Sequence, residues 1–130
     1  MEKKDYTQKF GEAVGTRIYH LHHNQVGDDY ELIGLTNLGT CTDMNALDQK
    51  LDVQKNQGNR FGPPKAGKDL SVREQAHVSS LAGTFARAHN IPDPFGSQTQ
   101  DMVKAGIVGV YAKIGANNLV TTDPAASLMH

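Results

Sequence analysis

The sequence predicts an all-α protein of about five helices in a single domain. Apolar residues recur at three- and four-residue spacing through most of the chain, which is the pattern of one helical face. No segment shows the alternation of apolar and polar residues that is typical of a half-buried strand. A chain of 130 residues, of which 38% are hydrophobic, has room for one core. We therefore expect one helical domain over residues 1–130.

A long N-terminal helix is expected within residues 1–26, because apolar residues repeat with helical spacing from Asp5 to about Gln25. Its apolar positions are Tyr6, Phe10, Val14, Ile18 and Leu21. Gly11 and Gly15 lie inside this pattern, and each costs up to about 1 kcal/mol relative to alanine in a helix interior. We therefore expect the helix to bend or to be held by contacts.

Two short helices are expected over residues 27–58. Asp28 or Asp29 can cap the first, YELIGLTNL, which ends at Gly39. Thr42 can cap the second, DMNALDQKLDVQKNQ, which carries apolar residues on one face. Lysines near the end of this second helix, at positions 50 and 55, complement the negative end of the helix dipole.

A basic loop follows over residues 59–70, because NRFGPPKAGKD combines two prolines and two glycines with basic residues. Residues 71–119 then predict a helical hairpin. Its first helix begins at Ser71, where Glu74 completes a capping box, and ends at Asn90 before a proline. Its second helix begins at Ser97. The tail at 120–130 has no clear period.

The last expected helix has two different faces. Large aliphatic residues form one of them, at Val103, Ile107, Val110 and Ile114. Small residues form the opposite face, at Ala105, Gly109, Ala112 and Ala116. Since the chain has few other large residues to pack there, we expect the small face to meet a second subunit or a DNA backbone. Replacing Gly109 by leucine should then impair assembly more than folding.

Charge is segregated along the chain. The net charge of −1 argues against a general nucleic-acid binder. However, residues 24–49 carry acidic residues and no lysine or arginine, and residues 50–73 carry an excess of basic ones. This arrangement fits either an ordinary solvated surface or a subunit with one face for phosphate. Candidate phosphate contacts are Lys3, Lys4, Lys9, Arg17, Arg60, Lys65, Lys68 and Arg73.

Other sequence features bear on the class of protein. Cys41 is the single cysteine, which excludes an internal disulfide and suits a reducing compartment. The charged N-terminus predicts no signal peptide, and no apolar run approaches the roughly 18 residues of a membrane span. The sequence has neither a phosphate-binding Walker loop nor a dinucleotide fingerprint. We expect no catalytic residues, no metal and no cofactor, and therefore not an enzyme.

His20, His22 and His23 are the basis of an alternative interpretation. His20 and His23 lie on one side of a helix at a spacing that could hold a metal, as in a small metal-dependent nuclease or toxin domain. Against this, the chain has no second cluster with ligand spacing. We expect these histidines instead to lie at a helix end or to face phosphate. A helical adaptor that binds a protein partner is a third hypothesis.

The C-terminal half resembles a known family. Its motifs are SVREQ at 71–75, IPDPFG at 91–96 and KIGANNL at 113–119. In this order they are similar to the C-terminal region of the major capsid proteins of rod-shaped and filamentous archaeal viruses, the rudiviruses, lipothrixviruses and relatives. The all-helical prediction and a polar segment leading into a long helix are also similar to that family.

The resemblance implies a structural protein of the virion, assembled in the host cytoplasm. It implies an arm-like N-terminal helix and an interlocked dimer, of identical or paralogous subunits, that wraps linear double-stranded DNA through backbone contacts. Such dimers stack into a helical nucleocapsid. The implied phosphate contacts are the eight basic residues above together with Arg87. Glu2 and Asp5 make the N-terminal arm less basic than a DNA-threading arm should be.

Overall fold

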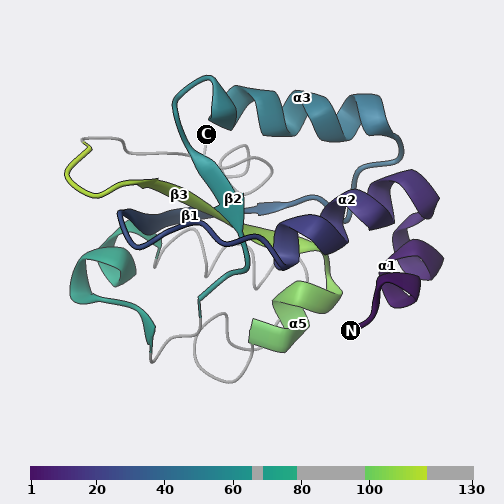
Figure 1. The fold of residues 1–130 in the computed structure, drawn as a ribbon, viewed down its shortest axis with the longest axis horizontal. Helices are drawn as coiled ribbons and strands as arrows, with labels where there is room; N and C mark the ends of the chain where they lie inside the picture. Colours follow the sequence, from purple (N-terminus) through teal and green to yellow (C-terminus); the bar gives the residue numbers. More distant parts are fainter. Residues whose placement is uncertain (66–68, 79–98, 117–130) are drawn as a thin grey trace.

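The structure is a computed structural model, and it describes residues 1–65, 69–78 and 99–116. These residues form a mixed α/β fold with a three-stranded sheet, so the all-α prediction is wrong. The strands are β1 (Tyr30–Asn37), β2 (Arg60–Gly62) and β3 (Ile107–Lys113). They lie in the order β1-β3-β2, and β3 pairs antiparallel with both neighbours. Figure 1 shows the sheet at the centre, between α3 (Met44–Lys55) and α5 (Thr99–Lys104).

Two segments that were expected to be helical are strands. The expected short helix at 30–38 is β1, and the second half of the last expected helix is β3. Both strands are almost wholly buried: every residue of β3 from Ile107 to Ala112 is covered. Strands covered on both faces show no polar alternation, so their apolar run can be mistaken for part of a helix. The branched residues Ile107, Val108 and Val110 favour the extended form.

The N-terminal segment is folded back and is not an extended arm. The single helix expected there is two helices, α1 (Lys3–Phe10) and α2 (Glu12–His22), separated by Gly11 with a φ of 92°. This left-handed backbone favours glycine. Gly15 of α2 packs so closely on α1 that a Cβ atom there would overlap the carbonyl group of Tyr6. Tyr6 itself is 1% exposed, so this segment belongs to the core.

Other expected elements are confirmed. Helix α3 forms as predicted, although its cap is Asp43, whose carboxylate accepts a hydrogen bond from the Ala46 amide at 2.8 Å. The capping box also forms: Ser71 Oγ accepts from the Glu74 amide, and Glu74 Oε1 accepts from the Ser71 amide, both at 3.1 Å. Residues 72–78 are helical. The expected helix end at Asn90, the break at 91–96 and the tail at 120–130 lie outside the described residues.

The sheet has a hydrophobic core on each face. One core joins α1, α2 and α3 to the sheet through Tyr6, Ile18, Leu21, Leu47, Leu51, Phe61, Val108 and Val110. The other joins α5 and the helix at 72–78 to the opposite face through Leu32, Leu35, Val78, Met102, Ile107 and Tyr111. The sheet is therefore the middle of three layers, and α2 and α3 lie on the same side of it.

Candidate functional site

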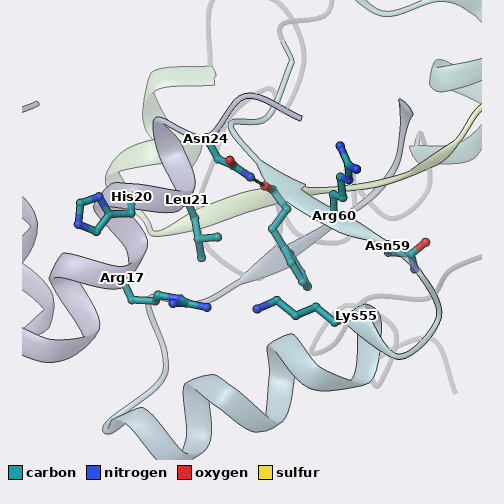
Figure 2. A pocket seen from close by; sticks show the side chains of 8 residues that line it. Arg17, His20, Leu21, Asn24, Lys55, Asn59 and Arg60 are labelled. Atoms are coloured by element: carbon teal, nitrogen blue, oxygen red, sulfur yellow. Dashed lines mark hydrogen bonds between the residues drawn. The ribbon is translucent and has the colours of Figure 1, made fainter. Parts of the chain in front are cut away.

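A pocket of about 310 Å³ lies where α2, α3 and β2 meet (Figure 2). This volume is at the lower end of the range for small-molecule sites in proteins. Its lining residues are Arg17, His20, Leu21, Asn24, Lys55, Asn59, Arg60 and Phe61. Basic and neutral side chains are both present among them, and none of these described residues is acidic. The pocket therefore has a positive lining.

Three elements position this lining. Arg17 and Leu21 are four residues apart on α2, so they share one face of that helix. Lys55 is the last residue of α3, where a cation complements the negative end of the helix dipole. Phe61 comes from β2, and only 2% of it is exposed. Leu21 and Phe61 supply the apolar part of the lining, and the two cations come from different helices.

Arg17 and Lys55 point toward each other across the pocket, and Leu21 lies above them in the view (Figure 2). Within the part of the chain that the structure describes, neither side chain forms an ion pair. The Nε atom of Arg17 is buried and has no hydrogen-bond partner there. Two like charges that converge in this way repel each other, and an anion placed between them would reverse the sign of the interaction. The geometry is suited to binding an anion.

The third cation of the pocket is already engaged. Arg60 donates a hydrogen bond from Nη1 to the carbonyl oxygen of Val26 at 2.8 Å, and its guanidinium lies 4.1 Å from the centre of the Tyr30 ring. The Asn24 amide donates a hydrogen bond to the Phe61 carbonyl oxygen. Both contacts attach the segment after α2 to β2. Arg60 therefore adds positive charge to the lining of the pocket. Its hydrogen bond to Val26 connects β2 to the segment after α2.

A second and larger pocket, of about 640 Å³, lies beside the first and shares Asn24 with it. Two of its polar side chains are paired: the Tyr111 hydroxyl donates to the Pro63 carbonyl oxygen, and Lys65 lies 2.7 Å from Glu74. Burial, with a smaller contribution from the charge of Glu74, raises the pKa of Tyr111 well above its usual range. We favour the smaller pocket as the site, because its two converging cations have no charged partner among the described residues.

The three neighbouring histidines do not form a cluster. His22 is buried, its Nε2 atom donates to the Ile107 carbonyl oxygen at 2.8 Å, and its Nδ1 atom accepts from the Tyr6 hydroxyl at 3.0 Å. His23 donates from Nδ1 to the Tyr19 carbonyl oxygen at 2.9 Å. His20 lines the pocket. Among the described residues, no group of three or more histidine, cysteine or acidic side chains is placed to hold a metal ion.

The basic residues expected to contact phosphate are spread over the molecule. Lys3 and Lys4 are exposed on α1, and Lys4 lies 3.6 Å from Glu2. Lys9 donates from Nζ to the Lys104 carbonyl oxygen. Of the expected residues, the structure brings Arg17 and Arg60 together at the pocket.

Two further basic residues are neutralised on the other side of the sheet. Lys65 pairs with Glu74, and Arg73 lies 3.3 Å from Glu31 on β1. Lys68 and Arg87 lie outside the described residues. The sequence analysis missed Lys55 as a site residue, because its place at the end of a helix already accounted for its charge. Lys55 lies in the basic block at 50–73, and this position could have indicated it as a candidate phosphate contact.

The small residues expected to form one helical face do not share a face. Gly109 and Ala112 are three residues apart in β3, so they lie on opposite sides of the sheet. A Cβ atom at Gly109 would approach Leu32 Cδ1 and the Tyr111 ring to 2.7 Å, and Ala112 is 2% exposed. Ala105 follows α5, and Ala116 follows β3. The helical surface expected from these residues therefore does not exist.

In the described residues, no helix combines the length and the hydrophobicity that crossing a membrane requires. Comparison of the chain with protein-family models, with curated proteins and with solved structures finds no match.

Proposed function

We propose that the protein binds a phosphate-bearing ligand between Arg17 and Lys55. One observation supports this most strongly: two cationic side chains from α2 and α3 converge over an apolar lining, without an acidic residue among the described residues around them. Their mutual repulsion is relieved when an anion lies between them.

The two side chains would act differently. The planar guanidinium of Arg17 can donate two parallel hydrogen bonds to two phosphate oxygens. The ammonium group of Lys55 is a compact charge that can neutralise a further oxygen. Leu21 and Phe61 form the apolar part of the lining beside the two cations.

We propose a role in binding and not in catalysis. The described residues that line the pocket include no carboxylate, thiol or hydroxyl side chain. These are the groups that most often serve as nucleophiles or, with histidine, as general bases. A histidine is present at position 20, without a nucleophile beside it among the lining residues.

Wrapping of duplex DNA by a capsid subunit stays a prediction. The family resemblance on which it depends assumes a helical hairpin over residues 71–119, and residues 107–113 of that segment form a strand instead. Among the expected DNA contacts, Arg17 and Arg60 are at the pocket, and Lys65 and Arg73 are paired with glutamates. Duplex DNA therefore enters the test below as one of two phosphate sources.

The proposal can be tested by NMR titration of the isotope-labelled protein with inorganic phosphate and, separately, with linear duplex DNA. We expect saturable shifts of the Arg17 and Lys55 side-chain signals. The double variant Arg17→Gln/Lys55→Gln, which lacks both side chains, should show no saturable shifts at the remaining lining residues. The control Lys113→Gln removes an exposed charge at the end of β3 and should keep them. If neither phosphate source produces saturable shifts at these two residues, the proposal is wrong.

A further inference from the structure

The charge and the oxygen count of the ligand can be matched to the two cations. Arg17 and Lys55 supply two positive charges from opposite walls. A phosphate monoester carries a charge of about −1.5 to −2 at pH 7 and has three free oxygens. Two of these oxygens can meet the guanidinium fork of Arg17, and the third can meet Lys55. A carboxylate carries a single negative charge, so it would neutralise only one of the two cations.

The shape of the pocket also favours a terminal phosphate. A phosphodiester has only two free oxygens and a single charge, and its chain must leave the site in two directions. Here the lining residues of α2 and α3 bound the site on two sides, and Arg60 of β2 lines it as well. A monoester has one ester oxygen, so only one connection has to leave the pocket. This is the main difference from the backbone of a nucleic acid.

The volume of the pocket leaves room for a further group next to the phosphate. The pocket of about 310 Å³ is roughly ten times the ~30 Å³ that one water occupies in the liquid, so a phosphate group alone does not fill it. Leu21 and Phe61 line that remaining space. An apolar or aromatic group bound there is removed from water, which adds affinity in proportion to the buried area.

We infer that the ligand is a phosphate monoester whose ester group is apolar, bound with its phosphate between Arg17 and Lys55 and its apolar part against Leu21 and Phe61. This inference rests on the proposed function. It narrows the ligand from any phosphate to phosphate monoesters with an apolar ester group. It also predicts that the duplex backbone is the poorer ligand.

The inference can be tested by calorimetric titration of the full chain with phenyl phosphate, inorganic phosphate, diphenyl phosphate, benzoate and linear duplex DNA. We expect phenyl phosphate to bind at least tenfold more tightly than each of the others. Lys55→Gln should weaken phenyl phosphate binding at least tenfold, and so should Arg17→Lys, which keeps the charge but loses the planar fork. The matched control Lys113→Gln should bind as the unchanged protein does.

The pH dependence gives a second readout. The second ionisation of a phosphate monoester has a pKa near 6, whereas a diester has no ionisation in this range. Affinity for phenyl phosphate should therefore fall between about pH 7.5 and pH 5.5, as the ligand loses its second charge. His20 is the histidine among the lining residues, which also include Arg17, Lys55 and Arg60, so the same binding experiment is repeated on His20→Gln.

The outcomes separate the two proposals. Equal affinity for phenyl and diphenyl phosphate, tighter binding of duplex DNA, or a pH-independent affinity for phenyl phosphate in His20→Gln would overturn the monoester inference and leave phosphate binding standing. Absence of binding by every phosphate compound, with the protein folded, would overturn both.

Discussion

His22 joins helix α2 to strand β3, because its Nε2 atom donates a hydrogen bond to the carbonyl oxygen of Ile107 at 2.8 Å. A carbonyl can only accept, so this bond places the imidazole proton on Nε2 and leaves Nδ1 to accept from the Tyr6 hydroxyl at 3.0 Å. A single neutral side chain thus holds together α1, α2 and the central strand. Burial lowers the pKa of His22. This effect is larger than that of the hydrogen bond to Ile107, which raises the pKa.

This contact predicts a loss of stability in mild acid. Since the pKa of His22 is lower in the folded than in the unfolded protein, the unfolded chain takes up this proton first as the pH falls. The stabilisation is complete above the unfolded pKa of about 6.5 and is lost as the pH falls toward the folded pKa. Urea unfolding between pH 7.5 and pH 5 should show a falling free energy of unfolding.

The variant His22→Leu leaves the Tyr6 hydroxyl and the Ile107 carbonyl without this partner. We expect it to lower the free energy of unfolding at pH 7.5 by about 1–3 kcal/mol and to flatten the dependence on pH below 7. The exposed residue His20 provides the control His20→Gln, which should keep the slope of the unchanged protein. An unchanged slope in His22→Leu would show that another group causes the dependence.

Glu74 predicts a second loss of stability at lower pH. Its carboxylate accepts hydrogen bonds from Lys65 at 2.7 Å, from the Leu32 amide of β1 at 2.8 Å and from the Ser71 amide at 3.1 Å. Burial alone raises the pKa of Glu74, but these donors and the charge of Lys65 together lower it below its usual value. Its stabilisation is therefore present above the unfolded pKa of about 4.3 and lost as the pH falls through the folded pKa.

We expect Glu74→Gln to lower the free energy of unfolding by about 1–3 kcal/mol at pH 7, because the ion pair with Lys65 is lost and an amide replaces one acceptor oxygen. The difference from the unchanged protein should shrink as the pH falls through the folded pKa of Glu74, because both side chains are then neutral. Asp48→Asn, on the exposed side of α3, is the matched control for loss of one acidic charge. A constant difference across the pH range would contradict the assigned role.

Gly109 gives a direct test of the corrected fold. On a helical surface, a larger residue here would impair assembly and leave the isolated chain folded, as expected from the sequence. In β3, a Cβ atom at this position would lie 2.7 Å from both Leu32 Cδ1 and the ring of Tyr111. We expect Gly109→Ala to destabilise the isolated chain by about 1–3 kcal/mol and Gly109→Leu to prevent folding.

Thermal unfolding followed by circular dichroism would measure this difference. Ile114→Ala changes a side chain just beyond β3 that is 55% exposed, and it should shift the unfolding temperature little. If the isolated Gly109→Leu chain keeps the unfolding temperature of the unchanged protein, residue 109 does not lie in a buried central strand.

The sequence by itself determined the features that depend on neighbouring residues. Helix α3 and the Ser71–Glu74 capping box could be predicted because their hydrogen bonds link residues only three or four positions apart. The cost of glycine inside a helix likewise predicted a disturbance of the N-terminal helix, and the chain breaks at Gly11. Among the residues of the pocket, the sequence indicated Arg17 and Arg60 as candidates for phosphate contact from their charge.

Only the tertiary structure decided the sheet and the pocket. In β1 and β3 both faces are buried, so the alternation that distinguishes a strand from a helix is absent, and pairing partners about 75 residues apart decide the backbone conformation. The pocket has the same origin. Arg17 and Lys55 converge because α2 and α3 pack on the same face of that sheet. The residue pattern of one helix does not indicate which side chains of the other helix will lie next to it.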